Sequence, residues 1–151
     1  MTIHRLHRRR RPAADYGGSL AKAGRWNTTG HGVLYCASSV SLCCLESLVH
    51  LDRTEIPSDY VWSTAQLDDV PGILEYHGDL WHIGNTRLAG DSWLQSRDAL
   101  AVRVPSVVIP SEHNVLLNSA HDEFDHLEWS APEPFTFDPR LLDPDVSYLF
   151  V

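Results

Sequence analysis

The sequence predicts a single α+β domain, in which a sheet of short strands is flanked by helices. Two segments have helical periodicity, several short apolar segments have the character of strands, and these strands cluster late instead of alternating with helices. The chain has 151 residues, of which 43% are hydrophobic and 21% charged. These values are typical of one globular domain covering 1–151, large enough to bury a core without disulfides.

Strand-like segments are predicted from apolar alternation and from prolines, which end strands because they cannot donate to a sheet ladder. Weak alternation predicts an edge strand at 3–7, and a Pro-, Gly- and Ala-rich loop follows at 11–22. The remaining predicted strands are 33–37, 60–67, 99–104, 106–109, 114–118, 127–130 and 135–137.

Two helices are predicted, over 39–51 and 85–96. Ser39 or Ser41 can cap the first by accepting hydrogen bonds from its free N–H groups. The apolar stripe of the first helix comprises Leu42, Leu45, Leu48 and Val49. In the second helix, the side chains expected to face inward are Leu88, Trp93 and Leu94.

The basic residues are concentrated at the N-terminus, where Arg5 and residues 8–11 supply five of the twelve Lys and Arg side chains. The formal net charge of the whole chain is −8. An acidic body repels polyphosphates, so we expect no direct DNA binding. The arginine run is either a solvated or partner-facing segment or a contact for phosphate, with Arg5 its inward-facing member.

Several classes of protein are disfavoured. No apolar run approaches the length of a membrane span, and the N-terminus lacks a signal peptide, so a cytoplasmic location is expected. Cys36, Cys43 and Cys44 are predicted to be buried apolar residues, because they form neither a disulfide framework nor a zinc motif. The nine histidines show no metal-binding spacing, and no dinucleotide or P-loop glycine motif occurs.

One arginine, one tyrosine and one glutamate lie within 22 positions and suit an anionic nucleotide. Arg25 follows Gly24, and an arginine fork matches phosphate geometry; the alternative is a surface arginine stacked on Trp26. Tyr35 offers a ring for stacking and a hydroxyl for a polar contact, or is a core tyrosine. Glu46 beside an apolar helix face can stabilise positive charge on a sugar, unless it forms a salt bridge with an arginine such as Arg25.

Two later polar positions are weaker candidates. Ser106 lies between predicted strands and could position a ligand; no nucleophile-elbow motif accompanies it. Asn118 and His121 follow a strand and could form polar contacts at the same site, although turn chemistry explains them equally well.

These residues belong to blocks that together resemble the RES domain family, toxins of bacterial type II RES–Xre toxin–antitoxin pairs. The resemblance extends over nearly the whole chain, and the blocks are Gly24-Arg25-Trp26-Asn27, Leu34-Tyr35-Cys36-Ala37-Ser38, Leu45-Glu46-Ser47-Leu48-Val49-His50-Leu51, Gly90-Asp91-Ser92-Trp93-Leu94, Val104-Pro105-Ser106-Val107-Val108-Ile109-Pro110, Asn114-Val115-Leu116-Leu117-Asn118 with His121, and Ala131-Pro132-Glu133-Pro134-Phe135. One departure is Asn118-Ser119, where the family usually has Asn-Pro.

The resemblance implies a fold similar to ADP-ribosyltransferases and an enzyme that consumes NAD as its substrate, without a cofactor. It implies that Arg25 binds the NAD phosphates, Tyr35 orients the nicotinamide end, Glu46 stabilises the oxocarbenium-like charge and Ser106 orients the nicotinamide side. Asn118 and Arg5 are further expected NAD contacts, and no metal is expected.

The expected function is therefore a toxin that cleaves the nicotinamide–ribose bond of NAD by hydrolysis or phosphorolysis and is neutralised by an Xre-type antitoxin. Transfer of ADP-ribose to a cellular protein is the alternative, and a nucleotide-binding module without turnover is a third. The sequence leaves open the acceptor of ADP-ribose, the oligomeric state and the role of residues 8–11.

Overall fold

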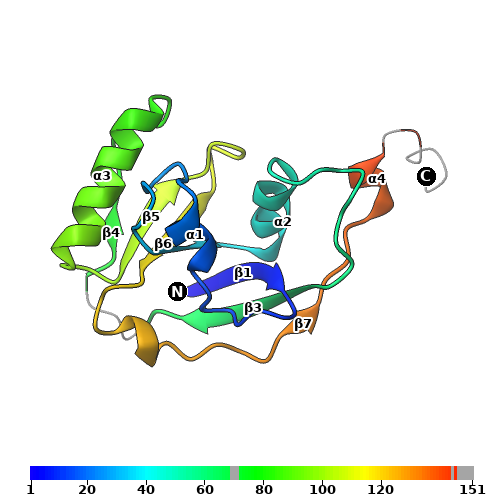
Figure 1. Cartoon of the computed structure of the whole chain (residues 1–151), viewed down its shortest axis with the longest axis horizontal. Coiled ribbons are helices and arrows are strands. Elements are labelled where there is room, and N and C mark those ends of the chain that lie inside the picture. Colours follow the sequence, from blue (N-terminus) through cyan, green and yellow to red (C-terminus); the bar gives the residue numbers. More distant parts are fainter. Residues whose placement is uncertain (69–71, 144, 146–151) are drawn as a thin grey trace.

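The computed structural model describes residues 1–68, 72–143 and 145, and confirms an α+β fold built on one seven-stranded sheet (Figure 1). The strand order is β4-β5-β6-β2-β1-β3-β7; β4 and β5 are parallel, and the other pairings are antiparallel. The elements are β1 (Thr2–Arg8), α1 (Gly17–Ala21), β2 (Val33–Ala37), α2 (Val40–Leu48), β3 (Tyr60–Gln66), β4 (Leu74–Glu75), α3 (Ile83–Ser96), β5 (Ala101–Pro105), β6 (His113–Asn118), the 3₁₀ turn η1 (Phe124–His126), β7 (Glu133–Pro134) and α4 (Pro139–Leu142).

Helices α2 and α3 cover one face of the sheet. Alternate residues of a strand point to opposite faces, and the register places the odd-numbered residues of β2 on the same face as the even-numbered residues of β6. Ala37 of that face packs against α2, and Val33 and Leu116 pack against α3. The opposite face carries Ile3, Leu34, Cys36, Val115 and Leu117, covered by Tyr16 and by Phe124 of η1.

The sheet is pinched between β1 and β2, which share a single register pair, His4 with Ala37. By contrast, β1 pairs with β3 at seven positions and β2 with β6 at five. The sheet therefore has two halves, and Figure 1 shows β1 and β3 running in a different direction from β5 and β6. Ala37 also pairs with Asn114, so His4, Ala37 and Asn114 form a row across the junction on the face of α2 and α3.

Helix α2 begins as expected but ends earlier. Ser39 caps it, with its hydroxyl oxygen accepting from the Leu42 N–H at 3.1 Å. The helix ends at Leu48, and Val49 is 56% exposed, so the predicted stripe over Val49 is wrong; Cys43 and Cys44 are buried in its place.

Three strand predictions are wrong. β1 is an interior strand because β2 and β3 pair with its two sides. Residues 106–109 form a loop, since the Ser106 side chain takes the N–H groups that a sheet would need. The predicted pair over 127–130 and 135–137 is reduced to an isolated bridge at Trp129 and to the two-residue β7.

The helix predictions were correct in part. Helix α1 interrupts the segment predicted to be a loop. In α3, Trp93 and Leu94 are buried as predicted, but Leu88 is 70% exposed. The three cysteines are buried and free, which confirms that interpretation. Among the described residues, no helix is long and apolar enough to cross a membrane.

Candidate functional site

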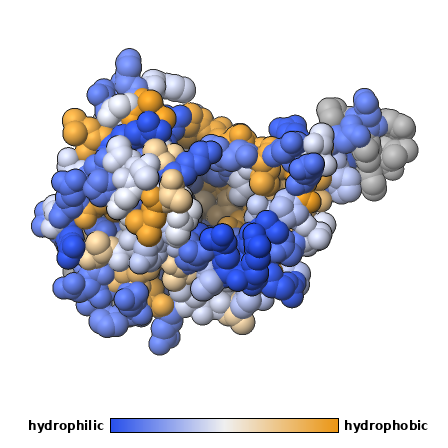
Figure 2. All heavy atoms as spheres, in the orientation of Figure 1, coloured by the Kyte–Doolittle hydropathy of each residue, from blue (hydrophilic) through white to orange (hydrophobic). Residues whose placement is uncertain are grey.

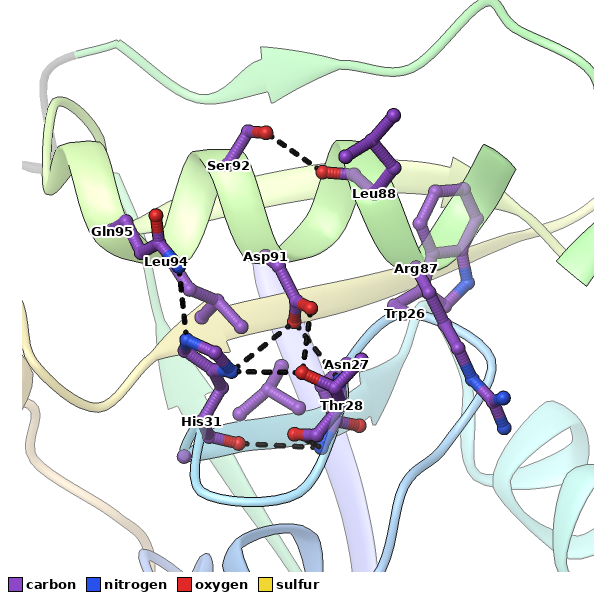
Figure 3. A network of polar contacts seen from close by, with 12 residues as sticks. Trp26, Asn27, Thr28, His31, Arg87, Leu88, Asp91, Ser92, Leu94 and Gln95 are labelled. Carbon is purple, nitrogen blue, oxygen red and sulfur yellow. Dashed lines mark hydrogen bonds and ion pairs between the residues drawn. The ribbon is translucent and has the colours of Figure 1, made fainter. Parts of the chain in front are cut away.

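The loop at residues 24–31 is fixed against one side of α3 (Figure 3). The Thr28 N–H and hydroxyl donate to the Asp91 carboxylate at 2.9 and 2.7 Å. His31 lies 3.4 Å from the same carboxylate, and its other ring nitrogen lies 3.2 Å from the Gln95 amide. Asp91 therefore joins two points of the loop to the helix.

The first residues of this loop lie against Tyr35 of β2. The Tyr35 hydroxyl donates to Asn27 Oδ1 at 2.7 Å and accepts from the Trp26 N–H at 3.2 Å. A Cβ at position 24 would overlap the hydroxyl and lie 2.8 Å from Asn27 Oδ1, so only glycine fits there. Burial raises the pKa of Tyr35 to about 12, which keeps the phenol protonated, while 37% of the residue remains exposed.

Arg25 is half-buried and held by uncharged groups. Its Nη1 donates to the Leu80 carbonyl at 2.8 Å, and its own carbonyl accepts from the Thr86 hydroxyl at 2.7 Å. Among the described residues no carboxylate pairs with Arg25, so the alternative of an Arg25–Glu46 salt bridge is wrong. The next residue, Trp26, is buried against α3, and among the described residues no cation–π contact joins it to Arg25, so the alternative of an arginine stacked on Trp26 is not found.

Glu46 projects from α2 and is held by two neutral donors. Ser106 Oγ and Asn114 Nδ2 both donate to Glu46 Oε1, at 2.7 and 2.6 Å. The two hydrogen bonds fix the orientation of the carboxylate and, because both donors are neutral, bring no opposite charge to it. No cation pairs with it in the described part of the chain.

The Ser106 hydroxyl serves the turn and Glu46 together. It accepts from the N–H groups of Val108 and Ile109 at 3.1 and 2.9 Å and gives its proton to Glu46. Ser106 is fully buried. Its hydroxyl is thus committed to positioning the carboxylate.

We call Arg25 and Tyr35, with the loop at 24–31, the loop arm, and Glu46 with Ser106 and Asn114 the helix arm. Tyr35 and Asn114 lie on the same sheet face, and Tyr35 is two residues from Ala37, the register partner of Asn114. Tyr35 and Ala37 are about 7 Å apart along β2, so the two arms lie next to each other on this face of the sheet. Figure 2 shows a recess between the half with α3 and the half with α2.

Two predicted contacts do not join these arms. Asn118 is buried at the opposite end of β6 from Asn114, where its amide donates to the Leu94 carbonyl and accepts from the Ala120 N–H. Arg5 alternates with His4 and so lies on the other sheet face, donating to the carbonyls of Ala13 and Asp15. Burial lowers the pKa of Arg5. Their proposed contacts with NAD stay predictions.

His121 forms turn contacts, with its Nδ1 accepting from the Glu123 N–H at 3.1 Å, in agreement with the turn interpretation. Among the described residues no group of three His, Cys, Asp or Glu side chains is arranged to hold a metal. A cavity of about 540 Å³ is lined by residues 64–66 of β3 and by residues between 123 and 130. Neither arm contributes to its lining.

Sequence reasoning missed Asn114 and His4. Asn114 lies 68 positions from Glu46, and only the pairing of β6 with β2 brings it to the site. His4 lies in the same row, and its Nδ1 is the one buried side-chain nitrogen or oxygen without a hydrogen-bond partner among the described residues. Burial lowers the pKa of His4. An alternation of apolar and polar residues in the first strand was the only signal for it.

The sequence matches the RES domain family over residues 2–138. The chain belongs to the RES domain family. A relative named "Toxin Res" from Yersinia enterocolitica is 36% identical over 93% of this chain and 99% of its own length. The "Prs ADP-ribosylating toxin" of a Sphingobium species is 34% identical over 86% of this chain and 88% of its own.

The fold of this RES domain also matches a solved structure, the MbcT–MbcA toxin–antitoxin complex of M. tuberculosis. The TM-score is 0.66 with 13% sequence identity, and the match covers 89% of this chain and 84% of the other. At this identity the likeness concerns the fold alone. It confirms the mixed sheet with helices as a fold shared with that complex, whereas the similarity to ADP-ribosyltransferases stays a prediction.

Proposed function

We propose that this RES domain protein is the toxin of a toxin–antitoxin system and cleaves the nicotinamide–ribose bond of NAD. The observation that carries the proposal is the state of Glu46, a carboxylate oriented by two neutral donors and free of any cation among the described residues. Breaking the glycosidic bond places positive charge on the ribose, and a fixed anion stabilises that charge. Relatives that are named toxins support the biological role.

Each arm has a part in this chemistry. Arg25 binds phosphate, and the exposed face of Tyr35 receives the nicotinamide or its ribose while its hydroxyl stays fixed to Asn27. Ser106 and Asn114 act on the substrate through Glu46. The bond between the ribose carbon and the nicotinamide nitrogen breaks with both electrons going to nicotinamide, which leaves as a neutral molecule. Water, losing a proton to solvent, or a phosphate oxygen then forms the new bond to carbon.

The test is mass spectrometry of NAD incubated with the purified protein, with and without phosphate. We expect nicotinamide together with ADP-ribose or its 1″-phosphate. Glu46→Gln keeps an oxygen for both donors but removes the charge, so we expect cleavage to fall about 10²–10³-fold with the fold unchanged. Normal cleavage by Glu46→Gln contradicts the mechanism, and no cleavage by the wild type contradicts the activity.

Transfer of ADP-ribose to a protein is the second candidate, favoured by the relative named as an ADP-ribosylating toxin. Labelled NAD added to a cell extract separates the two. A labelled protein band that depends on Glu46 supports transfer, and free ADP-ribose alone supports hydrolysis. Binding of NAD without release of nicotinamide would indicate a non-enzymatic module.

An antitoxin partner of the Xre type and a cytoplasmic location are parts of the same proposal. The fold match to a toxin–antitoxin complex supports the partner. Expression of the chain alone should arrest growth and deplete cellular NAD, while Glu46→Gln should permit growth. Co-expression with the antitoxin should restore growth, and the two proteins should co-purify.

A further inference from the structure

Arg87 of α3 reaches the loop arm, where its guanidinium binds a main-chain carbonyl. Its Nε donates to the Gly24 carbonyl at 2.7 Å. In the part of the chain that the structure describes, this is the only hydrogen bond of the guanidinium, and no carboxylate pairs with it. The Nη1 and Nη2 donors therefore remain available.

Most other half-buried arginines of this acidic chain have carboxylate partners. Arg8 pairs with Asp59 and Arg103 with Glu75, at 2.5 and 3.0 Å. Arg25 and Arg87 both lie half-buried and are fixed only by main-chain carbonyls. Partly desolvated cations without a paired carboxylate are costly, so two of them on segments in direct contact indicate a site for an anionic ligand.

Both arginines adjoin the segment that binds the Tyr35 hydroxyl, because Arg87 Nε donates to the Gly24 carbonyl and the Trp26 N–H, next to Arg25, donates to the hydroxyl. Burial raises the pKa of Tyr35 and Asp91 adds to that rise, while the charges of Arg87 and, more weakly, Arg25 oppose it. Figure 3 shows the Arg87 side chain extending from α3 past Trp26, with its guanidinium pointing away from the helix. The bond from Nε to Gly24 fixes this direction.

We propose that Arg87 and Arg25 together bind the diphosphate bridge of NAD, with Arg87 as a second phosphate-binding residue. The inference rests on the proposed function, because NAD supplies the diphosphate. Two guanidinium groups match its two negative charges, and each can present two parallel N–H donors to phosphate oxygens. The diphosphate would then lie on the loop arm and leave the nicotinamide ribose to Tyr35 and Glu46.

The experiment compares the wild type, Arg87→Ala, Arg87→Lys and the control Arg53→Ala, which removes the same charge from an exposed position. Initial rates give KM and kcat for NAD, and calorimetry gives the Kd for ADP, which carries the diphosphate without nicotinamide. Arg87→Gln is included because its amide keeps an N–H for the Gly24 carbonyl. Circular dichroism identifies the folded variants.

We expect Arg87→Ala and Arg87→Gln to raise KM for NAD and Kd for ADP by about 10–100-fold, with kcat changed little. Arg87→Lys should recover part of the loss, and Arg53→Ala should match the wild type. Wild-type ADP affinity in a folded Arg87→Gln overturns the inference, as does a fall in kcat alone, which a purely structural role produces. If the wild type releases no nicotinamide but Arg87 variants still lose ADP, the proposed activity fails and the anion site stands.

Discussion

The loop arm, with Arg87 beside it, and the helix arm carry charges of opposite sign, and the charged side chains of each are held by neutral groups. Arg25 and Arg87 donate to main-chain carbonyls, whereas the Glu46 carboxylate accepts from a hydroxyl and an amide. Guanidinium and carboxylate groups free to meet form strong paired bonds. Because the arginines and the Glu46 carboxylate are each hydrogen-bonded to uncharged partners, the opposite charges do not neutralise each other. Both remain available to a ligand.

The arms also differ in what supports them. The loop arm has no secondary structure of its own from 24 to 31 and depends on contacts with α3 through Asp91 and Gln95. The helix arm depends on the turn after β5 and on Asn114 in β6. Substitutions can therefore disturb one arm and leave the other in place.

Among the substitutions that change the support of the two arms, the largest effect is expected from Gly90→Ala, which disturbs the loop arm. A Cβ on Gly90 would overlap the main-chain oxygen of Trp26 and lie 2.8 Å from its carbonyl carbon, so backbone must move. We expect the free energy of unfolding to fall by about 2–3 kcal/mol and KM for NAD to rise at least about tenfold. Urea unfolding and initial rates measure both.

Gly84→Ala is the matched control in the same helix. A Cβ on Gly84 meets nothing within 4 Å, and alanine favours a helix over glycine by about 1 kcal/mol. Gly84→Ala should therefore be neutral or stabilising, with unchanged kinetics. Equal effects of the two substitutions would show that α3 itself, and not its contact with Trp26, controls the loop.

An intermediate effect is expected from Asn114→Asp, which alters the charge of the helix arm alone. A second carboxylate then lies against Glu46 in place of the amide donor, and two carboxylates in contact repel each other. Because Glu46 loses a donor and its fixed orientation, NAD cleavage should fall about tenfold. Initial rates measure the loss.

Asn114→Ala separates charge from the lost hydrogen bond. It removes the donor to Glu46 without adding a carboxylate, so cleavage should fall by less than in Asn114→Asp. Equal rates of the two variants would mean that the added charge has no effect at Glu46. ADP binding should be unchanged in both variants, since the loop arm is intact.

The loop arm was predictable from sequence and the helix arm only in part. Gly24, Arg25 and Tyr35 lie within 12 positions, so local glycine and arginine chemistry indicated them. The Glu46–Asn114 contact spans 68 positions and depends on strand order, which periodicity does not encode. The same limit explains β1, whose weak alternation suggested an edge although strands from elsewhere pair with both of its sides.

In the helix arm, a side chain that competes for main-chain N–H groups explains why residues 106–109 do not form the predicted strand. Residues 106–109 have the β-branched character of a strand, but the Ser106 hydroxyl binds two of their N–H groups and turns the chain. Likewise Val49 continues the apolar stripe of α2, yet the helix ends at Leu48 and leaves it exposed. Composition shows which side chains are apolar, and only packing shows which of them find a partner.

The smallest effect is expected from His4→Phe. His4 belongs to the row of His4, Ala37 and Asn114, which forms the floor between the two arms. The buried Nδ1 of His4 has no partner, so phenylalanine should raise the free energy of unfolding by about 1 kcal/mol at pH 7.5. Burial lowers the pKa of His4 below its ordinary value of 6.5. The unfolded chain therefore takes up the proton first as the pH falls below 6.5, and stability falls until the folded pKa is passed.

His4→Phe should thus lose less stability between pH 7.5 and 5.5 than the wild type, as urea unfolding at the two pH values will show. His7→Phe is the control, because burial also lowers the pKa of His7 but its ring nitrogens lie 3.0 Å from the Arg11 carbonyl and the Ser63 hydroxyl. That variant should be less stable than the wild type at pH 7.5. If His4→Phe is also less stable there, the unpartnered His4 Nδ1 does not limit the stability of the floor between the two arms.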